Sequence, residues 1–107
     1  MAQFDYYPAP SGKGYVVDVQ SDLMNHLNTR LVVPLLPIGQ APAPQQRLNL
    51  VFEILAVRHV FLTQFLTVMP VAGPTDRPEA GLGLPEGNLG EHALGIFNAL
   101  DMMFHGF

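Results

Sequence analysis

The chain has 107 residues and a formal net charge of −4, a length at which a single domain over residues 1–107 is expected. Hydrophobic residues make up 49% and charged residues 13%, a balance that predicts an apolar surface covered by a partner. The few basic residues form no stripe that could neutralise a run of phosphates, so direct nucleic-acid binding is disfavoured. They are Lys13, Arg30, Arg47, Arg58 and Arg77.

The chain contains no cysteine, which excludes disulfides, thiolate zinc sites and cysteine nucleophiles and fits a reducing cytoplasm. Its N-terminal MAQFDYYPAP lacks the regions of a signal peptide, and no run reaches the roughly 18 apolar residues of a membrane helix. Ten prolines and ten glycines favour strands over long helices. A soluble, cytoplasmic, mainly β protein is therefore expected.

The first third of the chain predicts three strands. Residues 3–7 are followed by two prolines and an SGKG turn. Residues 15–20 alternate between two faces, the pattern of a half-buried strand. Residues 30–37, RLVVPLLP, favour a strand, but Pro34 has no N–H to donate. We therefore expect an edge strand, or a bulge at Pro34.

The middle of the chain predicts two longer strands between two loops. The loop 38–47 has polyproline character and suits contact or mobility. Strands are expected at 50–55 and 57–70, as antiparallel neighbours joined by a tight turn around Ala56. The segment 71–87 is too rich in proline and glycine for regular structure, so we interpret it as a linker across the surface.

Residues 89–104 repeat apolar side chains at steps of three and four, which predicts an amphipathic helix. Asn88 and Glu91 have the spacing of a capping box at its start. Gly95 costs the helix about 1 kcal/mol relative to alanine, so we expect close packing against another backbone, such as that of a second subunit. Strands followed by one helix predict an antiparallel sheet or small open barrel covered by a C-terminal helix.

No catalytic motif emerges from the polar residues. The histidines His26, His59, His92 and His105 do not pair at metal-ligand spacing. Surface or rim positions are expected for His26 and His92, and a cross-strand or rim position for His59. Asp18 is interpreted as structural, as is Asp22, which could form an Asx-turn. The chain therefore indicates a protein that works by contact, without an enzymatic activity, a metal or a cofactor.

Several segments, in this order and spacing, resemble CcdB-type toxins of bacterial toxin–antitoxin modules. The resemblance spans nearly the whole chain, and the pairing of VDVQSD with the R-x-VVPL that follows it is its most specific part. The segments are VVDVQSDL (16–23), RLVVPLLP (30–37), NLVFEI (49–54), VFLTQ (60–64) and LDMMFHGF (100–107).

The resemblance implies a homodimeric SH3-like barrel with a C-terminal helix and an activity as a DNA gyrase poison. Proteins of this family bind the dimerisation region of the gyrase A subunit and trap the enzyme on cleaved DNA. A cognate CcdA-type antitoxin with a disordered C-terminal segment removes them. The gyrase contact uses the last three residues, Trp-Gly-Ile in the best-known pattern.

The matching positions here hold His105, Gly106 and Phe107. A neutral imidazole can stack on an arginine of the target as a tryptophan does, with less area, whereas a protonated one would repel it. Gly106 is expected to end the helix and free the last residue from helical geometry. Otherwise, the tail could fold back onto the core.

Two other functions stay open at this point. RNA-cleaving toxins share a similar barrel, so an endoribonuclease is one alternative, although it would need a cationic groove and an acid/base set. The second is a degenerate toxin that retains only antitoxin binding.

Overall fold

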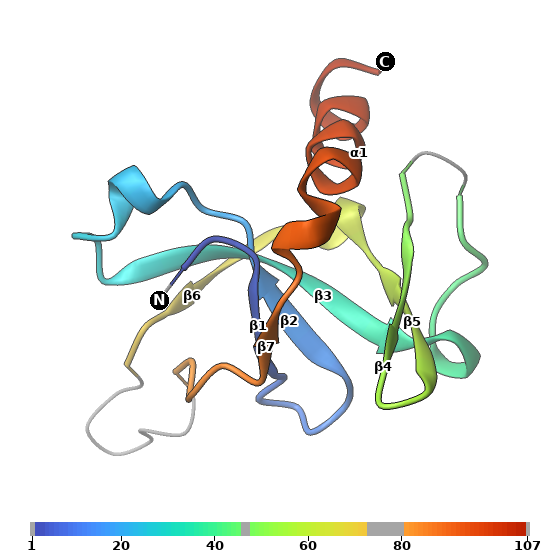
Figure 1. Ribbon diagram of the computed structural model, residues 1–107, viewed down its shortest axis with the longest axis horizontal. Helices are drawn as coiled ribbons and strands as arrows, with labels where there is room; N and C mark the ends of the chain where they lie inside the picture. Colours follow the sequence, from blue (N-terminus) through green and yellow to red (C-terminus); the bar gives the residue numbers. More distant parts are fainter. Residues whose placement is uncertain (1, 46–47, 73–80, 107) are drawn as a thin grey trace.

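The structure, a computed structural model, describes residues 2–45, 48–72 and 81–106. Over these residues, an antiparallel sheet curls into a half-barrel with one C-terminal helix, α1 (Ala93–His105), which confirms the expected mainly β class (Figure 1). The sheet has the order β4-β5-β3-β2-β1-β7, and β6 also pairs with β3. The strands are β1 (Asp5–Pro8), β2 (Tyr15–Asp18), β3 (Thr29–Pro37), β4 (Val51–Ile54), β5 (Val57–Phe61), β6 (Thr67–Pro70) and β7 (Gly87–Asn88).

The expectation that β3 is an edge strand is wrong, because β3 lies inside the sheet. The alternative, a bulge at Pro34, is not found in the pairing with β2, where Val16 lies opposite Pro34 in regular register. One side of β3 pairs with β2, while the other pairs first with β6 through residues 29–32 and then with β5 through residues 35–37. Pro34 lies between these two pairings, and its carbonyl accepts a hydrogen bond from the Leu62 N–H at 2.9 Å. The nitrogen of a strand residue points to the same side as its carbonyl. The missing donor of Pro34 therefore faces the point where β3 changes partner.

The single strand expected over residues 57–70 is interrupted by a 3-10 turn, η3 (Thr63–Phe65), which separates β5 from β6. The Thr63 hydroxyl is buried and donates to the Leu48 carbonyl, which fixes this turn. The tight turn around Ala56 is confirmed: Leu55 and Ala56 link β4 to β5 with φ angles of 52° and 64°. Both residues thus take the left-handed conformation that a two-residue hairpin of type I′ requires.

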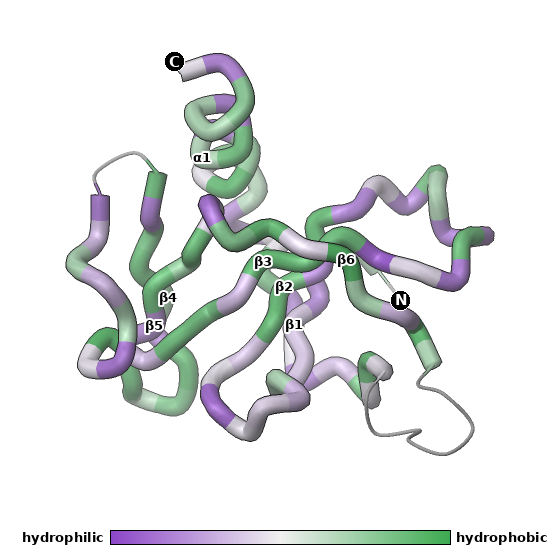
Figure 2. The backbone as a smooth tube through the Cα atoms, turned by 180° about the vertical axis from the view of Figure 1, so that it is seen from behind, coloured by the Kyte–Doolittle hydropathy of each residue, from purple (hydrophilic) through white to green (hydrophobic). Residues whose placement is uncertain are grey.

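Both faces of β2 are buried, so the half-buried strand expected from its alternation is wrong. Val17 belongs to the main core, which the helix residues Ile96 and Ala99 complete. Val16 faces the other way, into a second cluster. Figure 2 shows hydrophobic positions along both β2 and β3. The second cluster contains Tyr7, Val16, Val32 and Leu82.

The helix begins later than predicted. A 3-10 turn, η5 (Gly90–His92), precedes α1, which starts at Ala93. The Asn88 side chain accepts the N–H of Gly90, the first residue of this turn, at 2.6 Å, and its amide donates to the Gln3 carbonyl at 3.0 Å. The expected capping box is therefore wrong, because Asn88 ties the 3-10 turn to the N-terminus instead of capping an α-helix.

Gly95 does not lie against a backbone of another element among the described residues. A Cβ atom placed there would be 3.5 Å from a side-chain carbon of Leu50, which is an ordinary contact distance. The expected close packing is therefore wrong within the chain, and contact with a second subunit stays a prediction.

The two loops are described in part. Residues 46–47 and 73–80 lie outside the described residues, and residues 38–40 form a 3-10 turn, η2 (Ile38–Gln40). Leu82 is buried in the second cluster, so this part of the expected surface linker covers the sheet instead of crossing exposed surface.

Candidate functional site

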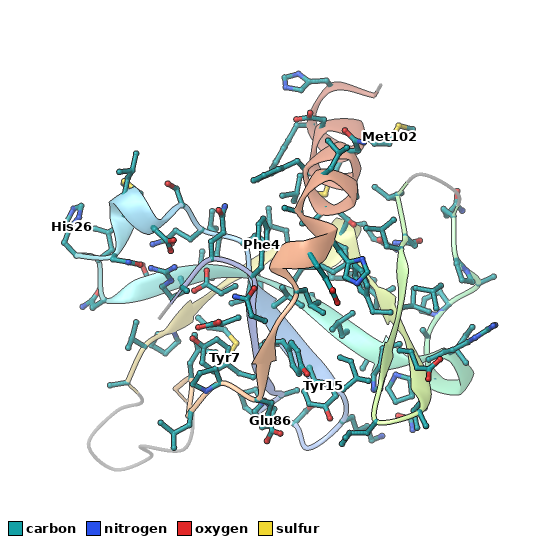
Figure 3. The ribbon with its side chains drawn as sticks, viewed as in Figure 1. Phe4, Tyr7, Tyr15, His26, Glu86 and Met102 are labelled. Carbon is teal, nitrogen blue, oxygen red and sulfur yellow. The ribbon has the colours of Figure 1, made fainter. Side chains whose placement is uncertain are left out.

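The C-terminal half of α1 projects away from the sheet (Figure 1). Ile96 and Ala99 in its first half are fully buried, whereas Phe104 near its end is 61% exposed. The helix is thus anchored at one end and free to make contacts at the other. Figure 3 shows this end, marked by Met102, far from the exposed loop that carries His26.

Gly106 ends the helix, as expected from the sequence. Its φ and ψ angles are 75° and 21°, and its N–H donates to the Met102 carbonyl at 2.9 Å. A left-handed residue in this position is a common helix stop, and glycine adopts it without steric cost. The chain direction therefore changes at Gly106.

His105 and Gly106 are both exposed, so this part of the tail does not fold back onto the core. The expectation that His105 lies beyond the helix is wrong, because it is the last residue of α1. Its ring is therefore presented by a helical backbone. Phe107, the third predicted contact residue, lies outside the described residues.

An apolar surface extends along α1 toward this tail. Leu94 is 74% exposed, and Phe97, Met103 and Phe104 are also exposed. Phe97 is held by an edge-on contact with Phe4 of the N-terminal segment, with ring centroids 5.3 Å apart. Exposed apolar side chains gathered on one element are typical of a protein–protein interface.

A comparison with family models matches residues 3–106 of the chain to the CcdB protein family. The chain belongs to the CcdB family. This is a family of toxins from toxin–antitoxin systems, and the match confirms the resemblance seen in the sequence. No curated protein sequence matches the chain.

The most specific part of the CcdB resemblance corresponds to a buried ion pair. Arg30 Nε donates to Asp18 Oδ2 at 2.7 Å, and both side chains are almost completely inaccessible to solvent. Asp18 Oδ1 accepts the Gln20 N–H at 3.0 Å, and the Arg30 guanidinium also bonds the Asn25 side chain. VDVQSD and R-x-VVPL are thus joined through their charged residues.

This ion pair holds the backbone of the connection between β2 and β3. The Gln20 side chain accepts the Leu31 N–H at 3.1 Å and donates to the Met24 carbonyl at 3.1 Å. Burial raises the pKa of the Asp18 carboxyl, and the hydrogen bond from Arg30 opposes that shift. Asp18 is therefore structural, as predicted. Asp22 is structural too, but its carboxylate accepts the Gln3 N–H at 2.7 Å instead of forming the expected Asx-turn.

The histidines outside the tail are scattered over the CcdB-type fold. His26 is exposed, whereas His59 is buried with its Nδ1 2.9 Å from the Val57 carbonyl oxygen. His92 is half exposed and packs on Phe52, with ring centroids 4.9 Å apart. The expected surface and rim positions are confirmed for His26 and His92. The expected cross-strand position is confirmed for His59, which lies opposite Pro37 of β3 and Phe52 of β4.

No metal-binding cluster is present among the described residues, in which no group of three or more His, Cys, Asp or Glu side chains could hold an ion. Within the same residues, no helix has the length and apolar character needed to cross a membrane. The candidate contact surface is formed by the projecting tail and the apolar surface of α1.

The sequence interpretation missed the ion pair between Asp18 and Arg30. The two residues are twelve positions apart, and they meet only because β2 and β3 pair side by side. The available signal was an aspartate in an otherwise apolar strand followed by an arginine at the start of the next one. A buried charge needs a partner, and this rule could have suggested the pair.

Proposed function

We propose that this CcdB-family protein is a gyrase poison, the toxin of a type II toxin–antitoxin system in the cytoplasm. It binds the DNA gyrase A subunit through His105, Gly106 and Phe107 and blocks the topoisomerase without catalysing a reaction of its own. A cognate CcdA-type antitoxin neutralises it. The observation that carries the proposal is the projecting end of α1, where an exposed His105 precedes a left-handed Gly106.

Each of the three residues has a distinct role in this contact. His105 is exposed on the last turn of α1, so its neutral ring can stack on an arginine of the gyrase surface. Gly106 offers no side chain that could obstruct the approach of the target, and its φ of 75° turns the chain out of the helix. Phe107 contributes an apolar side chain at the end of the chain.

The active form is proposed to be a homodimer. The support is the part of the apolar surface of α1 that Phe97 and Phe104 form, both of them exposed, in a chain that has few charged residues. Burying such a surface between two copies is favourable at roughly 25 cal/mol per Å² of apolar area. Light scattering at micromolar concentration tests this proposal, and a monomeric mass would contradict it.

A pull-down with purified gyrase A subunit tests the proposed gyrase contact. The full chain should retain the subunit, and a variant lacking residues 105–107 should lose it while keeping the far-ultraviolet circular dichroism of the full chain. His26→Ala is the matched control, because His26 is exposed at the other end of the molecule (Figure 3). Absence of binding by the full chain, or equal binding by the truncated one, would contradict the proposal.

The endoribonuclease alternative has less support. Arg30 is buried in the ion pair with Asp18, so it is not available to an RNA backbone. The other described basic residues, Lys13 and Arg58, lie on different hairpins and are exposed. Incubation of the purified protein with cellular RNA should therefore give no site-specific cleavage.

A further inference from the structure

The edges of the sheet differ in how their hydrogen-bonding groups are covered. β7 has only two residues, and the Pro70 carbonyl at the end of β6 accepts the Leu82 N–H at 3.2 Å. β4 pairs with β5 alone over the described part of the chain. An edge strand that no other segment covers is a template for an additional strand.

The register shows which groups of β4 face outward. Ile54 and Val57 flank the two-residue turn, so Ile54 and Phe52 direct their backbone groups toward β5. The Leu50 carbonyl accepts the Phe61 N–H at 2.8 Å, which continues this alternation. The intervening residues, Val51 and Glu53, therefore direct their N–H and carbonyl groups away from the sheet.

A groove of about 320 Å³ lies between this strand and the beginning of α1. Phe52 and His92 form part of its wall, with ring centroids 4.9 Å apart. Val51 and Leu94 also line it, and they are 44% and 74% exposed. The groove thus has both apolar and polar walls and lies directly beside unpaired backbone groups.

We propose that β4 and this groove bind an extended, basic segment of a partner protein by strand addition. The backbone of the partner pairs with Val51 and Glu53, and one aliphatic side chain enters the groove beside Leu94. A lysine or arginine of the added strand lies next to Glu53. Main-chain hydrogen bonds supply affinity in this mode of recognition, and alternate side chains supply specificity.

Charge and size determine this choice of occupant. On β5, the cross-strand neighbour of Glu53 is Arg58. On an added strand, the residue opposite Glu53 would be its second cross-strand neighbour, and a cation is favoured there because opposite charges attract across strands. Glu91, which also lines the groove, is 80% exposed and adds negative charge. β4 is four residues long, too short to be the main interface of a stable dimer, which buries about 1,600 Å². It is long enough for a peptide.

This surface is separate from the tail. It involves the beginning of α1, whereas His105 lies at the other end of this 13-residue helix, about 20 Å away at 1.5 Å per residue. The strand-addition proposal therefore does not depend on the proposed gyrase contact, and removal of residues 105–107 should leave peptide binding unchanged.

The probe for the test is a synthetic eight-residue peptide of alternating valine and lysine. Amide hydrogen exchange of the protein is followed by NMR with and without a saturating amount of this peptide. Exchange at Val51 and Glu53 should slow by about tenfold, because their N–H groups become hydrogen-bonded, while exchange at Phe52 and Ile54 should hardly change. A second peptide, N-methylated at the amides that would face β4, keeps the side chains and should have no effect.

Two variants complete the test. Glu53→Pro removes the outward N–H, which an edge strand tolerates, and should abolish peptide binding. Glu53→Gln keeps the N–H and should bind with a several-fold loss. The proposal would be overturned if the first peptide left amide exchange at Val51 and Glu53 unchanged, or if both peptides slowed it equally. Protection that rises with protein concentration without peptide would also overturn it, because a second copy would then occupy the edge.

Discussion

The connection between β2 and β3 and the projecting end of α1 use their side chains in opposite ways. The first buries a charged pair, Asp18 and Arg30, and its polar groups form hydrogen bonds that fix the backbone. The second exposes Phe104 and His105 and has few contacts of its own. The comparison indicates that substitutions in the first region should change stability, and those in the second should change binding.

The largest effect on stability is expected from Arg30→Met. This change leaves the Asp18 carboxylate buried without its partner, and loss of one partner of a buried ion pair costs roughly 3–5 kcal/mol. Urea unfolding at pH 7 measures the loss. The double variant Asp18→Leu/Arg30→Met is the matched control and should recover most of it, because it leaves no buried charge. A loss below about 1 kcal/mol would show that the ion pair does not hold this region.

The pH dependence of Arg30→Met sharpens this test. Burial raises the pKa of the Asp18 carboxyl, and removal of Arg30 takes away the hydrogen bond that opposes this shift. A carboxyl whose pKa is raised in the folded state favours folding when it is protonated, and this contribution is lost as the pH rises through the folded-state pKa. The destabilisation should therefore be smaller at pH 4 than at pH 7. Equal losses at both pH values would contradict this explanation.

A second buried polar group lies near the ion pair, in the second cluster. The Tyr7 hydroxyl is buried and has no hydrogen-bond partner among the described residues (Figure 3). Burial, together with the nearby Asp5 and Asp18, raises its pKa to about 12 from the ordinary value of 10. The folded state therefore holds this proton more tightly than the unfolded chain does.

Tyr7→Phe should remove a loss of stability at alkaline pH. Below pH 10, the contribution of Tyr7 to the free energy of unfolding is fully present in the wild-type protein. This contribution is lost as the pH rises toward 12, and it amounts to about 2–3 kcal/mol for this shift in pKa. Urea unfolding of both proteins between pH 8 and 12 should show a flatter curve for the variant. At neutral pH the variant should be as stable as the wild type or more so, since an unpartnered hydroxyl is removed. A clear loss at pH 7 would indicate a hydrogen bond to water.

The same contrast explains what could be predicted from the sequence. The strands around residues 3–7 and 15–20, the turn at Ala56 and the helix stop at Gly106 depend on local patterns, and all lie within a few residues of their predicted places. The interior position of β3 and the second buried face of β2 depend on which strands become neighbours. Alternation of side chains does not specify those neighbours.

Two further differences have local causes that the sequence does not make visible. The break at Thr63–Phe65 interrupts a run of strand-favouring residues, and it is fixed by a contact with Leu48, fifteen positions away. The Asn88 side chain donates to the Gln3 carbonyl of the N-terminal segment and accepts the Gly90 N–H. It therefore does not cap the α-helix, which begins later than the capping pattern predicts. In both cases, a tertiary contact decides the boundary of an element.

At the tail, Gly106→Ala should weaken gyrase binding by about tenfold, or 1.4 kcal/mol. An alanine at a φ of 75° is strained by about 1–2 kcal/mol, so the chain end should leave the left-handed conformation that ends the helix at Gly106. Because Gly106 is exposed at the end of the helix, the free energy of unfolding should change by less than about 0.5 kcal/mol. Binding by surface plasmon resonance and urea unfolding measure the two quantities. Equal losses in the free energy of binding and in the free energy of unfolding would contradict the expectation that substitutions in the tail change binding and not stability.

The smallest effect is expected from His105→Trp, which introduces the residue found in the best-known family pattern. Tryptophan has a larger ring and a stronger π face than a neutral imidazole, so stacking on a gyrase arginine should improve by about 0.5–1 kcal/mol. His105 is exposed on the last turn of α1, and its replacement should leave the free energy of unfolding unchanged. His26→Trp, at another exposed histidine, is the matched control and should not alter binding. If His105→Trp binds gyrase no better than the wild type, the ring at this position does not stack on the target, and the contact must depend on Phe107 and the surface of α1.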